Sequence, residues 1–600
     1  MTVNPSIPRW ATGEKASNMT ATLLRLLKYF GKYRWYIYIG AVLAITSTVL
    51  SVISPTFLAE MTNAVADSIS QGTDIDMEQI MRIGLLLAGM YLAGFICDAA
   101  GTRLAWVAEE INGDVMRKDL SAKVSRLPIG AVDSMKVGDV MSRFANDTDN
   151  IRSKGADCFI EMATGISMFT GCVIMMLITD WRLAVICLVP TVVGFIGIRR
   201  LIKWSQRYYR TQTKNLGRMN NLVGEVYNGL EVVNVYNGAD AARDGFMEIN
   251  DTLFSSALKS RFVGTVMPAL SGFVNNVGYL LVCVAGSVFI LEGTATYGTI
   301  VAFIVYVKLS NQPLNRIAGS LANMQMVSAS CERVFEFLDL PEMEDESGLK
   351  DAPKASKGRV DISGVDFSYV PGTSVLHGLE LHAEPGQKIA IVGPTGAGKT
   401  TIANLLLRFY EVDSGRIEID GTDIREMKRE EVRRLFSVVL QETWLFRGTI
   451  MDNIVFGAEE AVTRDRVMAA CEAVGMKAFI DSMPDGLDTY IKDPSTLSSG
   501  QRQQITIVRA MVRDAPILIM DEATSSVDTR TERHIQEAMD GLMAGRTSFI
   551  IAHRLSTIKS ADRILVIRKG NVIEQGTHAE LLSKGGFYRE LYDSQFESCE

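Results

Sequence analysis

Long apolar runs in the first 330 residues constrain the fold of this chain more than any other feature. A helix that crosses a bilayer needs about 20 mostly apolar residues. Six stretches meet that description, at 35–58, 81–104, 157–179, 181–198, 263–291 and 298–324. The apolar runs after residue 330 are short, as in a water-soluble domain. The sequence therefore predicts a membrane-spanning half followed by a soluble half.

The distribution of Lys and Arg predicts the orientation of these spans. Basic residues precede the first span and follow the second and the fourth. The short connections at 61–79, 180 and 292–297 contain neither Lys nor Arg. Because the number of spans is even, we expect a multi-pass protein of the cell membrane with both termini in the cytosol.

Composition divides the chain into four parts. Residues 1–33 form an N-terminal extension, in which 20–32 has the pattern of a basic amphipathic helix on the inner membrane surface or in the cytosol. Residues 34–330 hold the six spans. The long polar stretches between spans are predicted to be helical extensions, the alternative being separate cytosolic domains. Residues 331–357 are predicted to be a linker and 358–600 a second domain.

Charge and cysteine content exclude some classes of protein. The formal net charge is −8, which gives no electrostatic support for a nucleic-acid partner. The 8 Cys residues form no CxxC pair or metal-ligand cluster, so a disulfide framework is not expected.

The soluble half contains a full match to a phosphate-binding loop. Strand-like and helix-like patches alternate there, which favours an α/β domain. A predicted strand at Lys388–Val392 runs into Gly393, Pro394, Thr395, Gly396, Ala397, Gly398, Lys399, Thr400 and Thr401. Glycines let backbone N–H groups curl around phosphate oxygens, the lysine supplies positive charge and the threonine hydroxyl reaches Mg²⁺. The motif predicts a nucleotide site.

Two acidic residues follow a second apolar strand at 517–520. The tips of parallel strands are where ligands bind in α/β proteins. Asp521 suits a Mg²⁺ ligand and Glu522 suits a general base that activates water. Two acids after a strand are weak evidence alone, but beside a phosphate loop they favour hydrolysis of the nucleotide.

These motifs and the segment between them resemble the ATP-binding cassette (ABC) exporters. The run Leu497, Ser498, Ser499, Gly500 and Gln501 is similar to the signature LSGGQ of that family. The resemblance covers nearly the whole chain. It implies an all-α six-helix transmembrane domain joined to an α/β P-loop ATPase domain. It further implies that ATP, bound with Mg²⁺, drives export of a drug, lipid or peptide by alternating access.

The resemblance also assigns roles to single residues. It implies that Tyr369 stacks on adenine, although a strand aromatic can also belong to the core. Gln441 matches the loop that senses Mg²⁺, so the implied metal ligands are Thr400, Gln441 and Asp521. His553 matches the residue that contacts the γ-phosphate, which makes the catalytic set Lys399, Glu522 and His553.

The remaining matches concern the dimer and the membrane half. Asp528 matches the loop that communicates across the dimer. Ser498 and Gly500 would cap the γ-phosphate bound by the opposite subunit, so the resemblance implies that a second half-transporter is required. Leu127 and Pro128, with residues 138–147, resemble the first loop that transmits nucleotide binding to the membrane helices.

Two departures from the family pattern suggest an asymmetric dimer. Ser499 stands where the family usually has Gly, and residues 489–496 lack the usual Glu-x-Gly element, whereas Glu522 is intact. This combination resembles the Glu-containing subunit of heterodimeric bacterial multidrug exporters. We therefore expect a partner chain with an altered catalytic glutamate. The alternatives are a homodimer, or an ATP-regulated membrane protein that does not pump.

Overall fold

The computed structural model describes residues 18–353, 356–370, 372–441, 443–458, 462–521, 529–552 and 555–596. These residues form two compact units. The helical unit comprises the described residues up to Ser125 together with Val137–Leu340. The sheet unit comprises Arg126–Lys136 and the described residues from Pro341 onward.

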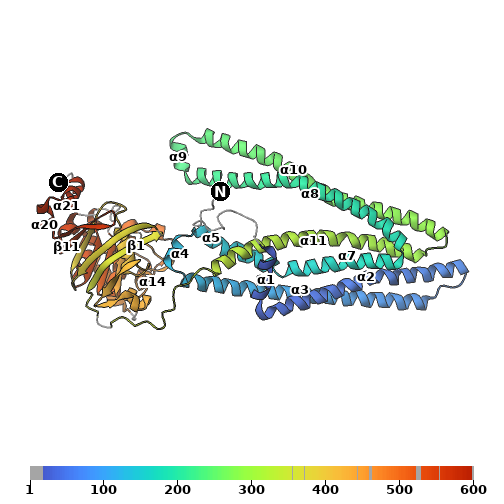
Figure 1. The fold of residues 1–600 in the computed structure, drawn as a ribbon, viewed down its shortest axis with the longest axis horizontal. Coiled ribbons are helices and arrows are strands. Elements are labelled where there is room, and N and C mark those ends of the chain that lie inside the picture. The colour runs from blue at the N-terminus through green and yellow to red at the C-terminus, as the bar shows by residue number, and fades with distance from the viewer. Residues whose placement is uncertain are drawn as a thin grey trace. The chain divides into compact units, whose positions relative to one another are not determined.

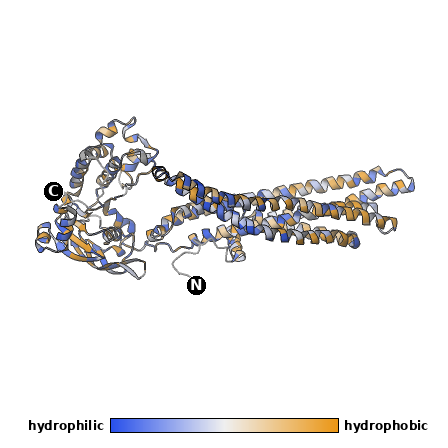
Figure 2. Ribbon diagram, turned by 90° about the horizontal axis from the view of Figure 1, so that it is seen from above, coloured by the Kyte–Doolittle hydropathy of each residue, from blue (hydrophilic) through white to orange (hydrophobic). Residues whose placement is uncertain are grey.

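Long helices build the helical unit (Figure 1). Its elements are α1 (Met19–Tyr29), η2 (Gly31–Tyr33), α2 (Arg34–Gln71), α3 (Met77–Arg126), α5 (Val137–Ser142), η3 (Arg143–Asp147), α6 (Thr148–Lys154), α7 (Asp157–Thr179), α8 (Trp181–Asn228), α9 (Leu230–Val235), α10 (Ala239–Leu291) and α11 (Tyr297–Leu338). Helices α3, α8 and α10 each continue as helix far beyond their apolar runs, which agrees with the helical form of the predicted extensions. Figure 2 shows apolar residues concentrated toward one end of these helices, where the short loops lie.

Five of the described helical segments have the length and apolar composition of a bilayer span. They are Gly31–Gln71, Met77–Arg126, Val137–Thr179, Trp181–Asn228 and Ala239–Leu291. The sixth predicted span lies in α11, where Lys308, Gln312 and Asn315 interrupt the apolar run. Helix α11 packs against α2, α7 and α10, and a helix surrounded by protein tolerates more polar residues than one facing lipid. The count of six spans remains a prediction.

Helix α11 also extends into the segment predicted as a linker. It ends at Leu338, and strand β1 begins at Val360. Cys331, Val334 and Phe337 are buried, so the last turns of α11 belong to the packed helical unit. The linker was predicted from the polar residues that follow α11. Polarity alone does not show at which residue the preceding helix ceases to pack on its neighbours.

The N-terminal amphipathic helix is held on the end of α11. Arg25 donates to both carboxylate oxygens of Asp339 at 2.7 Å and lies 4.2 Å from the ring centre of Phe335. Tyr29 donates to Asp119 of α3. Leu26 is fully buried between these contacts. The apolar face of α1 therefore packs on protein in addition to any surface it presents to lipid.

The sheet unit contains three sheets. A six-stranded sheet has the order β12-β11-β3-β10-β9-β6, a four-stranded sheet the order β2-β1-β4-β5, and β7 pairs with β8. The strands are β1 (Val360–Val370), β2 (Thr373–Ala383), β3 (Lys388–Val392), β4 (Ser414–Ile419), β5 (Thr422–Asp423), β6 (Phe436–Val439), β7 (Gly448–Thr449), β8 (Tyr490–Ile491), β9 (Ile517–Asp521), β10 (Thr547–Ile551), β11 (Arg563–Arg568) and β12 (Asn571–Gly576).

One face of this sheet packs on helices that include α15 and α17, and the other face packs on the four-stranded sheet and on α12. The helices are α4 (Ile129–Asp133), α12 (Lys399–Leu406), α13 (Arg429–Arg434), α14 (Ile450–Ile454), α15 (Arg464–Ala473), α16 (Lys477–Asp481), α17 (Ser499–Arg513), α18 (Thr529–Met543), α19 (Leu555–Lys559), α20 (His578–Lys584) and α21 (Phe587–Phe596). Alternate residues of β3 enter different cores: Ile389 and Ile391 join β1 and β2, whereas Ala390 and Val392 join α15 and α17. A parallel strand buried on both faces needs such a continuous apolar run.

Candidate ATP site

The predicted site residues follow strands that end at one edge of the six-stranded sheet. Strands β3, β10, β9 and β6 are parallel neighbours. Ile551 of β10 pairs with Ile391 of β3 on one side and with Asp521 of β9 on the other. The ends of these three strands are therefore in register. Val439 of β6 pairs with Met520. Because the carboxyl ends of parallel strands share an edge, the segments after them converge there.

The loop after β3 has the backbone of a phosphate cradle. Gly396 and Gly398 have φ angles of +81° and +105°, which side-chain-bearing residues rarely adopt. A Cβ atom on Gly398 would lie 2.8 Å from Leu376 Cδ2, and one on Gly393 would lie 2.2 Å from the carbonyl oxygen of Ile567. The loop is therefore left-handed at Gly396 and Gly398, and too crowded for a side chain at Gly393 and Gly398.

Lys399 begins α12 and reaches back across the loop. Its Nζ donates to the carbonyl oxygens of Gly393 at 2.7 Å and Pro394 at 3.3 Å. Burial lowers the pKa of Lys399, while the negative charge of Asp521 raises it. Gly398 is the N-cap of α12 and offers no side-chain cap, so the first N–H groups of this helix can serve a ligand. The cradle, the ammonium and the positive helix end together suit a polyphosphate.

The structure describes some of the other predicted site residues and not others. Asp521 ends β9, and Gln441 follows β6 with an exposed side chain. Glu522, Asp528 and His553 lie outside the described residues. Asp521 and Ala552, which precede Glu522 and His553 in the chain, are described at the ends of adjacent strands.

Tyr369 lies near the end of β1 beside the phosphate-loop helix. Its hydroxyl lies 3.1 Å from Thr401 Oγ1 and accepts from Asn404 Nδ2 at 3.3 Å. Its exposed fraction is 44%, which argues against the alternative of a core aromatic. Asn404 was not predicted from the sequence. Its spacing of three residues after Thr401 on a helix is the signal that places both side chains on the face toward Tyr369.

The signature segment forms the capped start of α17. Ser498 Oγ accepts from the Gln501 N–H at 3.2 Å, and Gln501 Oε1 accepts from the Ser498 N–H at 2.9 Å. This reciprocal pair is a capping box and explains why Ser and Gln stand three residues apart. Ser499 is the first helical residue and is not among the described residues with positive φ. The side chain at Ser499 therefore introduces no backbone strain.

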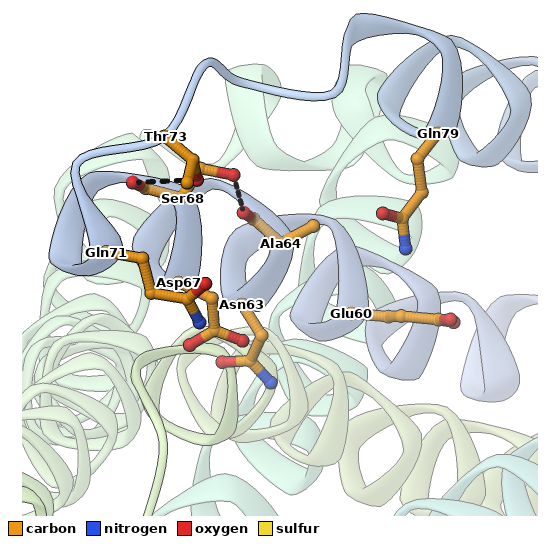
Figure 3. Close-up of a pocket in the computed structure, with 8 residues that line it drawn as sticks. All are labelled: Glu60, Asn63, Ala64, Asp67, Ser68, Gln71, Thr73 and Gln79. Carbon is orange, nitrogen blue, oxygen red and sulfur yellow. Dashed lines mark hydrogen bonds between the residues drawn. The ribbon is translucent and has the colours of Figure 1, made fainter.

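A separate polar hollow lies in the helical unit between α2 and the loop to α3 (Figure 3). Its volume is about 310 Å³, and Glu60, Asn63, Asp67, Gln71 and Gln79 are among its lining residues. Asn63 Oδ1 accepts from the Gly298 N–H at 2.8 Å and so joins α2 to α11. Within the described residues no group of three or more His, Cys, Asp or Glu could hold a metal ion. This hollow is not part of the ATP site.

Comparison with known proteins finds a matching family model for each half of the chain. The family model for the ABC transporter transmembrane region matches residues 37–314, and a second family model, described as ABC transporter, matches residues 376–525. A fatty acid ABC transporter ATP-binding/permease protein of Mycobacterium bovis is 40% identical over 87% of this chain and 82% of its own length.

Two further relatives cover almost the whole chain. The uncharacterised ABC transporter ATP-binding protein YfiC of Bacillus subtilis is 35% identical over 97% of this chain and 96% of its own length. An ATP-dependent lipid A-core flippase of Methylobacillus flagellatus is 34% identical over 96% of this chain and 97% of its own length. This multi-pass membrane protein therefore belongs to the ABC transporters, with a helical transmembrane domain fused to an ATPase domain that binds ATP and couples its hydrolysis to transport.

Proposed function

We propose that this chain is one half of a dimeric exporter that moves a lipid-like amphipathic substrate across the cell membrane by alternating access. The observation that carries the proposal is the shared edge of β3, β9 and β6, which brings the phosphate loop, Asp521 and Gln441 together in a chain with bilayer-length helices. The preference for lipid over drug or peptide rests on the relatives named for fatty acid and lipid A transport.

The residues of the site divide into binding and chemical roles. Lys399 would exchange its two backbone carbonyl partners for phosphate oxygens. Thr400, Gln441 and Asp521 would hold Mg²⁺, whose charge offsets that of the phosphates. Glu522 would take a proton from the attacking water as general base. His553 would contact the terminal phosphate and hold the catalytic geometry.

The second subunit would complete this site with its own signature segment, and this chain would do the same for the site of the second subunit. Leu497–Gln501 would approach the nucleotide held by the partner, with Ser498 and Gly500 at its terminal phosphate. An exposed apolar tip, formed by the end of α8 and by α9 with the residue after it, supports a protein partner. There Tyr227, Val235 and Tyr236 are 77%, 74% and 80% exposed, at the end of the helical unit away from the short loops (Figure 1). Apolar groups gathered outside the lipid-facing region favour burial against protein.

We propose further that the partner is a different chain. Ser499 adds a hydroxymethyl group to the first turn of α17, at the surface that would meet the partner's nucleotide. The chain keeps Glu522, so the partner would supply an intact signature and carry an altered glutamate. The alternative is a homodimer with two equal sites, because the serine fits the helix without strain.

ATP turnover of the chain expressed alone tests the asymmetric dimer. We expect a purified homodimer in lipid nanodiscs to turn over slowly, and S499G to raise that rate several-fold by restoring the usual signature. T496S, a small change just before the signature, serves as the control and should leave the rate unchanged. Rapid turnover of the unmodified chain, or no gain from S499G, would support the homodimer.

Transport in sealed inside-out vesicles tests export. We expect ATP-dependent accumulation of a fluorescent long-chain fatty acid or phospholipid in vesicles that contain the active dimer. Vesicles with E522Q should bind ATP and accumulate nothing. ATP hydrolysis that proceeds without movement of any lipid probe would favour the alternative of a non-pumping ABC protein.

A further inference from the structure

The part of α8 that follows its apolar run carries a face of Lys and Arg. From Trp181 to Gly224 the chain has no Asp or Glu, and from Arg200 onward basic residues recur every three or four positions. At 3.6 residues per turn, seven basic residues fall within about 100° of the helix circumference. All seven side chains are exposed. This set, the α8 basic face, comprises Arg199, Arg200, Lys203, Arg207, Arg210, Lys214 and Arg218.

The charges of the α8 basic face are not balanced by acidic partners. Within the part of the chain that the structure describes, none of the seven side chains has an ion pair. Basic residues that follow the second predicted span differ, because Lys118 pairs with Asp114 at 2.6 Å and Arg126 pairs with Glu342 at 3.9 Å. The general excess of Lys and Arg on the cytosolic side is met equally well by paired residues. It therefore does not account for a face that has no acid.

Helix α10 lies antiparallel beside α8 (Figure 1). A Cβ atom on Gly194 would lie 2.6 Å from Val274 Cγ2, and the Lys259 Nζ atom lies 5.2 Å from the ring centre of Tyr208. These two contacts are 14 residues apart on α8 and 15 residues apart on α10. The two helices therefore keep one register along this stretch.

That register adds further cations to the level of the α8 basic face. Since both helices rise equally per residue, residues 199–214 of α8 are level with about 254–268 of α10. The α10 stretch contains Lys259 and Arg261 and has no Asp or Glu. The helix pair is therefore uniformly positive at this level.

The predicted bilayer boundary crosses the α8 basic face. The apolar run of α8 ends at residue 198 and that of α10 begins at 263. Residue 263 is level with about residue 205 of α8, so the boundary on α8 lies between 198 and that level. Arg199, Arg200 and Lys203 lie in this interval. Long basic side chains there can reach the lipid headgroups while their stems stay on apolar surface.

Aromatic side chains are interleaved with these cations. Trp204 and Tyr209 are 50% and 62% exposed, and the ring centres of Trp204 and Tyr208 are 5.1 Å apart. Trp and Tyr are enriched where a membrane meets water, because their rings are apolar and carry one polar edge. Charge and aromatic content therefore both favour the headgroup level for this part of α8.

We propose that the part of the α8 basic face nearest the bilayer is a binding site for anionic phospholipid. The site comprises Arg199, Arg200, Lys203 and Arg207 of α8 with Lys259 and Arg261 of α10. Guanidinium and ammonium groups bind phosphate oxygens through charge-assisted hydrogen bonds, and clusters of Lys and Arg beside a span attract anionic lipid. With the predicted orientation, the lipid belongs to the cytosolic leaflet. The site needs only the bilayer and these side chains, so it does not depend on the proposed export.

Native mass spectrometry of the purified full chain in detergent tests the proposal. Dioleoylphosphatidylglycerol should bind with a Kd about tenfold lower than that of dioleoylphosphatidylcholine. Tetraoleoyl cardiolipin, which has two phosphates, should bind more tightly still. Equal Kd values for phosphatidylglycerol and phosphatidylcholine would overturn the proposal.

A soluble headgroup separates a lipid site from a pocket for a free phosphate ester. Glycerophosphoglycerol has the headgroup of phosphatidylglycerol without its acyl chains, so at equal concentration it should not displace the lipid. Displacement by this compound would contradict a site at the bilayer surface.

Variants assign the binding to the α8 basic face. K203Q/R207Q should raise the Kd for phosphatidylglycerol by about tenfold and leave the Kd for phosphatidylcholine unchanged. K203R/R207K keeps both charges and should bind both lipids as the unmodified chain does. R117Q/K118Q removes the same number of charges from exposed positions of α3, where Lys118 already has an acidic partner, and serves as the control.

The same spectra report whether the face contacts protein instead of lipid, because they resolve monomer from dimer. The proposal expects K203Q/R207Q to lose phosphatidylglycerol and to keep the dimer. Lipid binding that survives in this variant would refute the site. Loss of the dimer with unchanged lipid binding would assign the α8 basic face to the second subunit.

Discussion

Replacement of Glu522 by Gln should lower ATP turnover of the active dimer by roughly 10²–10⁴-fold, the range for loss of a general base. Glu522 directly follows Asp521, the last residue of β9. A neutral amide cannot accept the proton that the attacking water must lose. The substitution preserves shape and leaves the phosphate loop intact, so the Kd for ATP should change little. Phosphate release and displacement of a fluorescent ATP analogue measure the two effects separately.

K399A provides the comparison that separates chemistry from binding. Lys399 Nζ lies within the phosphate loop, bonded to the carbonyl oxygens of Gly393 and Pro394. Its loss removes charge-assisted hydrogen bonds to phosphate, each of which contributes about 1.5–3 kcal/mol. We therefore expect K399A to weaken ATP binding itself. Unchanged turnover in E522Q would remove Glu522 from its role, whatever the result for K399A.

The phosphate loop could be predicted because its signals are local. Lys388–Val392 is a continuous apolar strand, Lys399–Leu406 is a helix, and glycines with positive φ lie between them. The arrangement of the strands could not be predicted in the same way. Strand β10 follows β9 in the chain but lies between β3 and β9 in the sheet. Only that non-local pairing makes Asp521 level with the phosphate loop.

Contacts between distant segments explain most of what sequence patterns missed. Tyr410 Oη donates to Asp133 Oδ2 at 2.6 Å although the two residues are separated by 277 positions, and neither residue stands out by periodicity or motif. The resemblance of Leu127 and Pro128 to a coupling loop suggested a link with nucleotide binding, but the composition of 126–136 gives no sign that this segment folds with the ATPase domain. In the helical unit, apolar runs predicted the long helices. They predicted too short a helix for α11. Its final turns are buried by neighbouring helices, although the segment has several polar residues.

An ion pair in the helical unit gives the second large expected effect. Asp147, the last residue of η3, is 1% exposed. Arg333 of α11 donates from Nε to Asp147 Oδ2 at 2.8 Å and from Nη2 to the other carboxylate oxygen. Arg143 lies nearby with its guanidinium 5.5 Å from the Phe337 ring centre. The pair joins a π-helical turn that follows α5 to the helix that leads toward the ATPase domain.

R333M should destabilise the helical unit because it leaves the Asp147 carboxylate buried without its bidentate partner. Breaking a buried pair typically costs about 3–5 kcal/mol. The Arg333 side chain is 43% exposed and the charge of Arg143 remains close. We therefore expect a cost of about 2–3 kcal/mol, at or below the lower limit of that range. The measurement is the apparent Tm of the purified full chain in one detergent, which should fall by several degrees.

Two further variants decide whether a lost charge partner or lost packing is the cause. Arg82 and Glu78 form an ion pair whose side chains are 76% and 75% exposed, so R82M should shift Tm little. Adding D147N to R333M removes the buried charge and should restore most of the lost Tm, since a neutral amide is cheaper to bury than a carboxylate. A Tm for R333M equal to that of R82M would show that water already screens Asp147. No recovery in the double variant would assign the loss to packing of the arginine stem, in which case the pair does not hold η3 to α11 through charge.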